Sequence, residues 1–212
     1  MNFIANKQNI FNFTDFTLLT ENVSDKNLFN FYDDYQEYAS LDLAPSSFCA
    51  FPENLITLAQ KHSILNNPCV VINFPHADDE FENISKDFTI ASHYNAEIDL
   101  VFPSVEFLKN TKKSLTKTVK LLEFYKKEVA KHSFGVVKVI FDTTYYEVVD
   151  EKGESTLNVD MLSKALVVAE QLPQKDKLIA AIFNYIHVQR ASFSSEKDEI
   201  VRIFDLEEDV KF

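Results

Sequence analysis

A carboxylate and a lysine each stand inside an apolar segment of this chain, where an ionised group needs a physical reason. Asp99 lies within residues 97–103, which read EIDLVFP, and Lys138 lies within residues 136–142, which read VVKVIFD. A charge in such a segment is costly to desolvate unless it is paired, hydrogen-bonded or used in chemistry. A carboxylate beside a lysine can relay protons through a bound water. Asp99 and Lys138 are therefore the first candidates for catalytic residues.

Each of these two residues has more than one interpretation. A desolvated lysine next to a second cation can have its pKa lowered enough to act as a nucleophile. No second cation is evident in the sequence near Lys138, which favours a structural ion pair with Asp99 or Asp15. A contact with substrate and a nucleophilic amine stay open as alternatives. Asp99 is either a proton-relay acid or a hydrogen-bonded core acid without a remaining task.

The segments that would position these residues recur along the chain, with helical sequence between them. Residues 69–76 read CVVINFPH and form, with the two segments above, apolar strands about 30–40 residues apart, which is the rhythm of repeated βα units. Polar residues toward the carboxyl ends of such strands fall where a βα barrel places its chemistry. The sequence therefore predicts an α/β protein with a TIM-type (β/α) barrel.

Five short segments resemble, in order, strands of the class I deoxyribose-phosphate aldolases. They read DFTLL at 15–19, FCAFP at 48–52, NFPH at 73–76, EIDLVFP at 97–103 and KVI at 138–140. The order and approximate spacing agree over about residues 10–145. The resemblance implies a TIM barrel and a lyase that uses a Schiff base and no cofactor. Its reaction, in deoxyribonucleotide catabolism, would cleave 2-deoxyribose 5-phosphate to glyceraldehyde 3-phosphate and acetaldehyde.

The same resemblance implies roles for five residues of this chain. Asp99 would belong to the proton-transfer network of aldol cleavage, and Lys138 would lie beside the reacting lysine. Asp15 and Thr17 match the first-strand pattern. They would be substrate-binding residues that point into the same opening of the barrel. Cys49 matches a position near the substrate pocket, although a small buried thiol is usually core packing.

The covalent lysine of that family has no counterpart here. The family forms its Schiff base on a lysine in a KTSTG strand and keeps a second lysine in an FKPAGG strand, and neither motif occurs in this sequence. The nearest match to the first motif is KLIAAIF at residues 177–183, which puts Ala180 in the place of the lysine. At 212 residues the chain is short for a complete barrel of this family. We therefore expect one domain over residues 1–212, with a barrel that is incomplete or divergent over 143–212.

The composition limits which ligands the protein could bind and indicates in which cellular compartment it resides. Only two glycines are present, Gly135 and Gly153, and neither lies in a phosphate-cradling loop. The family's binding of a sugar phosphate through glycine-rich turns is therefore expected to be lost. A net charge of −12 and a pI of about 4.8 argue against nucleic acid and anionic membranes as partners. No apolar run reaches the length of a membrane span, and the amino terminus lacks a signal-peptide pattern. The expected location is the cytoplasm.

Cysteines and histidines give no metal-type pattern in the sequence. Cys49 and Cys69 both sit in apolar strands without metal-ligand spacing, which indicates a reducing compartment. The histidines are equally unpatterned, so no metal is expected. His76 is either a general acid or a loop histidine, and the loop is favoured.

The remaining segments are predicted as follows. Helices are expected at 24–38, 52–61, 78–94, 104–132, 158–172 and 194–206. An extended insert or hairpin is expected after Asp142, with a turn at Gly153. Residues 175–190 suit a helix, whereas 177–183 equally suit a buried strand.

Three interpretations of function remain open from the sequence. The first is an aldolase-like protein with lost or impaired cleavage activity, a pseudoenzyme that binds a small phosphorylated sugar or aldehyde in a binding or regulatory role. The second is an active carbon–carbon lyase that uses Lys138 or a lysine from another chain. The third is a truncated gene product. Because an open sheet edge invites association, a homodimer is also expected.

Overall fold

A computed structural model describes residues 15–40, 45–132, 134, 136–153 and 155–169, and the backbone alone of residues 178–183. Six of the described strands form one parallel sheet in the order β1-β2-β3-β4-β5-β8. Their bounds are β1 Asp15–Leu18, β2 Ser47–Ala50, β3 Pro68–Ile72, β4 Glu97–Val101, β5 Val137–Asp142 and β8 Leu178–Phe183. The five predicted parallel strands are confirmed. The ambiguous segment forms a sixth strand, paired in parallel with β5.

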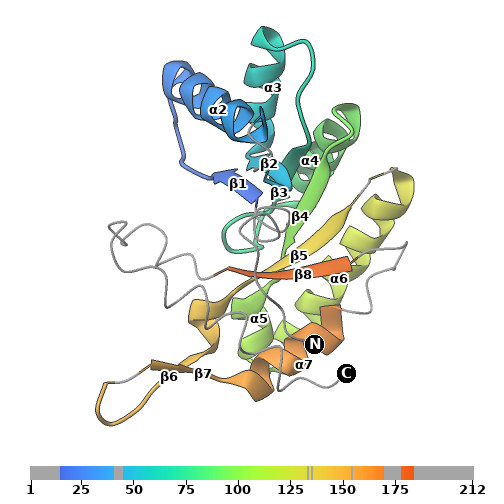
Figure 1. Ribbon diagram of the computed structural model, residues 1–212. Helices are drawn as coiled ribbons and strands as arrows, with labels where there is room; N and C mark the ends of the chain where they lie inside the picture. Colours follow the sequence, from blue (N-terminus) through green and yellow to red (C-terminus); the bar gives the residue numbers. More distant parts are fainter. Residues whose placement is uncertain are drawn as a thin grey trace, which may run out of the picture.

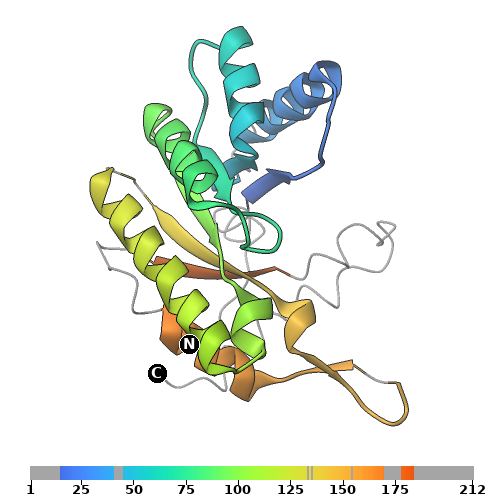
Figure 2. The ribbon, with the colours of Figure 1, turned by 180° about the vertical axis from the view of Figure 1, so that it is seen from behind.

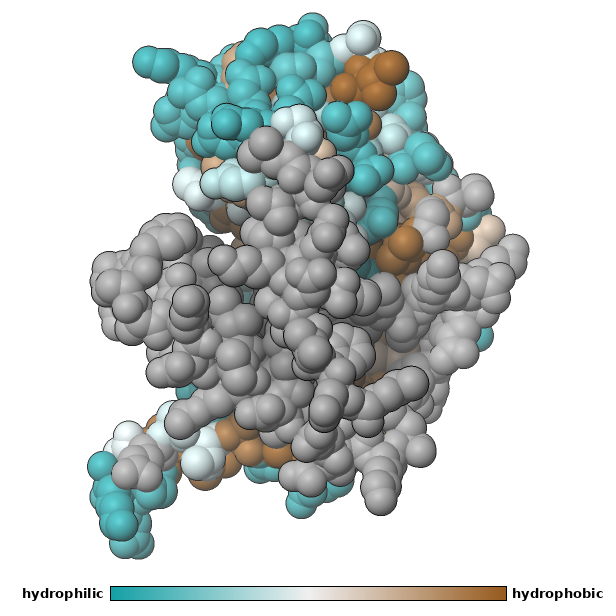
Figure 3. Space-filling view, viewed as in Figure 1, coloured by the Kyte–Doolittle hydropathy of each residue, from teal (hydrophilic) through white to brown (hydrophobic). Residues whose placement is uncertain are grey.

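The sheet curls, and the helices that connect its strands lie on its outer face (Figures 1 and 2). The helices are α2 Asp25–Ser40, α3 Pro52–Lys61, α4 Phe81–His93, α5 Ser104–Leu108, α6 Lys112–Lys131 and α7 Val159–Ala169. Every residue of β2 and β3 is buried, because a parallel sheet of this kind is covered on both faces. Hydrophilic residues predominate over α2 and α3 on the face seen in Figure 3. The outer helices therefore separate the sheet from solvent.

Aromatic side chains fill the space between the first strands and their helices. Tyr32 and Tyr35 of α2 are 1% exposed and pack on Phe48 of β2, with ring centroids 5.0 and 5.4 Å away. Burying one large apolar side chain stabilises a fold by roughly 1.5–3 kcal/mol. The Tyr32 hydroxyl accepts a hydrogen bond from the Asn66 amide, and the Tyr35 hydroxyl donates to the Asn66 carbonyl. These contacts hold α2 and the loop before β3 against the sheet.

The predicted helical region at 104–132 is two helices, which corrects the single continuous helix that its pattern suggests. Asn110 adopts a φ of 47°, a conformation that an α-helix excludes and asparagine tolerates. Thr111 then caps α6, because its hydroxyl accepts from the Ser114 amide at 3.1 Å and the Ser114 hydroxyl accepts from the Thr111 amide at 3.0 Å. The capping box restarts the helix on a new axis.

The loop after β3 delays the next helix, so α4 begins at Phe81 and not at Asp78 as predicted. Asn73 has a φ of 64°, and its side-chain oxygen accepts a hydrogen bond from the Asp79 amide at 2.9 Å. The Asn73 amide nitrogen donates to the Tyr125 hydroxyl at 2.8 Å, which in turn donates to the Val101 carbonyl at 3.1 Å. This buried chain ties the carboxyl ends of β3 and β4 to α6.

After β5 the chain leaves the sheet and projects as a hairpin (Figures 1 and 2). A 3-10 turn, η1 Thr143–Tyr146, leads into the antiparallel pair β6 Glu147–Val149 and β7 Ser155–Leu157. Gly153 has a φ of 81° in the connecting turn, which a residue with a side chain rarely adopts. The predicted hairpin is thus present, preceded by a helical turn that its β-branched sequence did not suggest.

Three predictions have a partial outcome or none. The predicted helix at 158–172 is present as α7 within the described residues. The predicted terminal helix at 194–206 lies outside them. Among the helices described, none combines the length and the apolar run that crossing a lipid bilayer requires.

Candidate functional site

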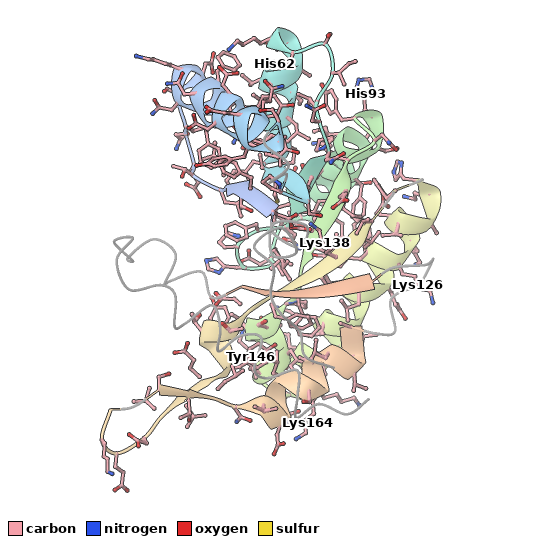
Figure 4. The ribbon with its side chains drawn as sticks, in the orientation of Figure 1. His62, His93, Lys126, Lys138, Tyr146 and Lys164 are labelled. Carbon is pink, nitrogen blue, oxygen red and sulfur yellow. The ribbon has the colours of Figure 1, made fainter. Side chains whose placement is uncertain are left out.

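Three carboxylates and one ammonium meet inside the curl of the sheet. The Lys138 Nζ atom, on β5 in Figure 4, lies 2.5 Å from Oδ2 of Asp15 and 3.0 Å from Oδ1 of Asp99. A third carboxylate oxygen, Oε2 of Glu97, lies 3.5 Å away. The exposed fractions of the Lys138, Asp15 and Asp99 side chains are 6%, 7% and 3%. This group, Asp15, Glu97, Asp99 and Lys138, is called the ion cluster below.

The register and the curl of the sheet explain why these side chains meet. Asp99 and Lys138 are direct partners on the neighbouring strands β4 and β5. Asp15 is on β1, separated from β5 by three strands. With about 4.8 Å between strands, a flat sheet would hold them about 19 Å apart. The contact between Asp15 and Lys138 therefore requires the sheet to fold over, as it does when opposite strands face each other across a barrel interior.

Two hydroxyl groups complete the surroundings of Asp15. Ser47, its partner on β2, donates a hydrogen bond from Oγ to Oδ1 of Asp15 at 2.6 Å. The two Asp15 carboxylate oxygens are therefore used by Ser47 and Lys138. The Thr17 hydroxyl donates instead to the backbone carbonyl of Asp15 at 3.3 Å. Thr17, predicted to face the substrate, thus bonds its own strand, while Ser47 is a neighbour that the sequence analysis did not single out.

Two buried thiols lie against the other side of Asp99. The Cys49 Sγ atom lies 3.5 Å from Oδ2 of Asp99, and Cys49 pairs in register with Cys69 on β3. The ligand atoms of Cys49, Cys69 and Asp99 all lie within 4.8 Å of one another. Cys69 was not predicted as part of any site. The sequence places Cys69 in the strand that follows the strand of Cys49. The contact between the two thiols becomes predictable only when the register of these two strands is known.

Burial governs the protonation of the acids and thiols. Desolvation raises the pKa of Asp99 above its ordinary value, an effect that Lys138 opposes and Asp15 reinforces. Desolvation likewise raises the pKa of Cys69 well above the usual thiol value. A hydrogen bond with Cys69 lowers the pKa of Cys49, but burial and Asp99 together raise it by more. Both thiols are therefore neutral at physiological pH in the protein as it stands.

Lys138 is held in its charged form. Burial lowers the pKa of its ammonium, whereas Cys69, Asp99 and Asp15 raise it by more, so that the pKa lies above the usual lysine value. Because the thiol of Cys69 is neutral, we assign the increase to the carboxylates. An ammonium has no lone pair to attack a carbonyl. The favoured interpretation of Lys138, a structural ion pair, agrees with this geometry.

The ion cluster lies toward the amino ends of the strands and not at their carboxyl ends. Lys138 is the second residue of β5, and both Asp15 and Glu97 begin their strands. Glu97 also lines a polar hollow of about 300 Å³, together with Leu65, Asn67, Pro68, Tyr94 and Asn95. At the carboxyl ends, His76 Nδ1 lies 3.3 Å from the Tyr145 hydroxyl, joining the loops after β3 and β5. His76 is thus a loop histidine with a hydroxyl partner.

Comparisons with known proteins place this fold. The sequence matches no protein-family model and no curated protein. Among solved structures, a putative deoxyribose-phosphate aldolase from Coccidioides immitis is similar, with a TM-score of 0.61 and 16% identity over 82% of this chain and 61% of that one. The chain has the fold of deoxyribose-phosphate aldolases. The predicted resemblance and the predicted α/β, TIM-type class are confirmed.

Other similar structures give the same result. One is the deoxyribose phosphate aldolase from Aeropyrum pernix, described as a unique tetramer, with a TM-score of 0.51 and 19% identity over 77% of this chain and 62% of that one. Another is a putative deoxyribose-phosphate aldolase from Toxoplasma gondii, with a TM-score of 0.56 and 18% identity over 82% of this chain and 64% of that one. The chain thus spans less than two thirds of the length of these aldolases.

Proposed function

We propose that this protein is an aldolase-like binding or regulatory protein that cleaves 2-deoxyribose 5-phosphate weakly or not at all. It would retain part of a site for a small phosphorylated sugar or aldehyde. The observation that carries the proposal is the pairing of Lys138 with Asp15 and Asp99 at 2.5 and 3.0 Å inside the sheet. Schiff-base chemistry needs an uncharged amine, and these carboxylates favour the ammonium.

The backbone register of β8 supports the same proposal. Ala180 is the partner of Val139, and Ile179 is the partner of Lys138, so the strand beside Lys138 offers no amine at these two positions. Ala180 is also the residue that the sequence resemblance aligns with the family's covalent lysine. With alanine in the place of the covalent lysine, the protein would keep the proton-relay acid Asp99 but would lack the nucleophile of the reaction.

Turnover and binding measured separately test this function. Release of acetaldehyde from 2-deoxyribose 5-phosphate is followed with an NADH-coupled alcohol dehydrogenase, and binding of the same sugar phosphate is measured by isothermal titration calorimetry. We expect no acetaldehyde above the level without protein, together with saturable binding. Saturable binding that is unchanged in Lys126→Ala, an exposed lysine on α6, and weakened in Asp15→Asn would support a retained half-site. Absence of both binding and turnover would contradict the proposal.

The active lyase is the second candidate, because Asp99 and Lys138 remain direct neighbours as a relay pair would require. It predicts acetaldehyde release that disappears in Lys138→Ala and is slowed in Asp99→Asn. The exposed Lys126→Ala variant is the matched control, since it removes the same side chain type without touching the ion cluster. Turnover with this pattern would replace the binding role by lyase activity.

A further inference from the structure

The ion cluster contains more negative than positive charge. Three carboxylates, those of Asp15, Glu97 and Asp99, face the single ammonium of Lys138. Glu97 is the most exposed of them, with 23% of its side chain accessible, while Asp99 is 3% accessible. Buried carboxylates without an opposite charge are costly. Asp99, the most buried of the three acids, is therefore the one whose oxygens most need polar partners.

Asp99 is the acid best placed to take a second cation. Its Oδ1 atom is within ion-pair distance of Lys138 yet has no partner in hydrogen-bonding geometry among the described residues. Its Oδ2 atom accepts a hydrogen bond from the Cys49 thiol at 3.5 Å. The two oxygens thus face different groups, and Oδ2 shares its side with sulfur.

The spacing of the sulfur and oxygen atoms fits a tetrahedral metal. Zinc binds thiolate sulfur at about 2.3 Å and carboxylate oxygen at about 2.0–2.2 Å, which sets the sulfur–oxygen edge of a tetrahedron at about 3.5 Å. The Cys49 Sγ and Asp99 Oδ2 atoms are 3.5 Å apart. The Cys69 sulfur lies within 4.8 Å of both. The three atoms are therefore close enough for rotations of their side chains to bring them onto one metal ion, whose fourth position they leave open.

We propose that Cys49, Cys69 and Asp99 form a binding site for a divalent cation of the zinc class at the centre of the sheet. Two sulfur ligands favour zinc over magnesium or calcium, which prefer oxygen. Three strands, β2, β3 and β4, each supply one ligand, so the spacing in the sequence is long and gives no metal motif. The site shares Asp99 with the ion cluster, but binding of a metal alone can be measured without any sugar phosphate.

Binding at this site has a defined proton balance. Each thiol loses its proton to solvent when its sulfur bonds the metal, so one ion displaces two protons from Cys49 and Cys69. No electron is transferred, and the carboxylate of Asp99 needs no proton exchange if it is already ionised. A disulfide between the same two cysteines would instead consume an oxidant and remove both ligands.

Cobalt(II) is the probe for this site, because thiolate ligands give it a charge-transfer absorption that zinc lacks. The full-length protein is purified under reducing conditions, stripped with a chelator and titrated with Co²⁺ alone. We expect one equivalent to bind with thiolate charge-transfer absorption, and Zn²⁺ to displace it. Cys69→Ser should abolish the absorption, and Asp99→Asn should weaken Co²⁺ binding by about tenfold or more. Thr118→Val, a buried substitution on α6, should bind as the original chain does.

A measurement on the unsubstituted chain keeps the proposal testable if a variant fails to fold. Calorimetric titration with Zn²⁺ in buffers of different ionisation enthalpy should report two protons released per ion. The proposal is overturned if no thiolate absorption appears, if a folded Cys69→Ser protein binds cobalt with unchanged absorption, or if fewer than one proton is released. A Cys49–Cys69 disulfide in protein purified without reductant, persisting after reduction is attempted under native conditions, would also overturn it.

Discussion

Lys138 takes its chemical character from residues on other strands. Its partners Asp15 and Asp99 come from β1 and β4, and the contact with Asp15 joins residues 123 positions apart. A lysine in a site of this kind reacts only if its surroundings favour the free amine. Here they favour the ammonium, so the same side chain that resembles a catalytic lysine serves as the counter-ion of two buried acids. The catalytic roles predicted for Asp99 and Lys138 stay predictions.

Removing the ammonium should destabilise the protein. In Lys138→Ala the carboxylates of Asp15 and Asp99 lose their counter-ion, and we expect the free energy of unfolding to fall by about 3–5 kcal/mol, the cost of leaving buried charge unpaired. Urea denaturation measures the loss. Lys126→Ala on the surface of α6 should change it by less than about 0.5 kcal/mol. Adding Asp15→Asn to Lys138→Ala should recover part of the loss, and a Lys138→Ala protein as stable as the original would contradict the ion-pair role.

At the scale of single elements, the strands were the most predictable part of the fold. The apolar runs around Asp99 and Lys138 were predicted as buried strands, and their residue ranges agree closely with β4 and β5. Residues 177–183 stayed ambiguous because a short apolar run suits a helix and a strand equally. The break at Asn110 was missed because it depends on a backbone conformation that the helical pattern does not encode. The approach of Cys69 to Cys49 was missed for a related reason, since it depends on register.

The capping box of α6 gives a test at this scale. In Thr111→Ala the Ser114 amide loses its acceptor, so we expect a decrease of about 1 kcal/mol in the free energy of unfolding. Thr116→Ala, an exposed position on the same helix, should leave stability unchanged or slightly higher, because alanine favours helix. Chemical denaturation of the two variants side by side is the measurement. Equal stabilities would show that the helix start does not depend on Thr111.

The contact between α3 and α4 predicts a pH dependence. Desolvation, with Asp79 and Glu53 nearby, raises the pKa of Asp87 from 3.8 to about 7. The folded protein therefore keeps this proton over a range where the unfolded chain releases it, so its contribution to stability is present below about pH 4 and is lost as the pH rises through 7.

Asp87→Asn should remove this pH dependence. At pH 8 the variant should be more stable than the original chain by about 1 kcal/mol, allowing for solvent screening of a half-buried group. At pH 4 the two should be nearly equal. Thermal denaturation across this pH range measures the difference, and Asp160→Asn, at an exposed position on α7, is the control. A difference between Asp87→Asn and the original chain that does not grow with pH would contradict the assignment.

The parallel sheet is curved as in the aldolase fold, and within the described residues it has two edge strands, β1 and β8. As the described residues form it, the parallel sheet runs from β1 to β8, and the hairpin of β6 and β7 projects from the body (Figure 1). The curl is sufficient to bring Asp15 across to Lys138, which is the contact that defines the candidate site. A site assembled this way depends on the arrangement of the entire sheet, and not on any one segment.

The association state is a prediction at this scale. Because unpaired strand edges favour association, we expect a homodimer, with twice the chain mass of 24.4 kDa. Light scattering coupled to size-exclusion chromatography measures the mass directly. A mass of one chain at micromolar concentration would contradict the prediction.

The most direct test of the central claim asks whether any lysine forms a Schiff base. The protein is incubated with acetaldehyde or 2-deoxyribose 5-phosphate, reduced with borohydride and analysed by intact-mass and peptide mass spectrometry. Because Lys138 is held as an ammonium by Asp15 and Asp99, we predict no stoichiometric adduct on it. A stoichiometric adduct on Lys138 that is absent in Lys138→Ala, slowed in Asp99→Asn and unchanged in Lys126→Ala would contradict the account and establish a lyase with a relocated nucleophile.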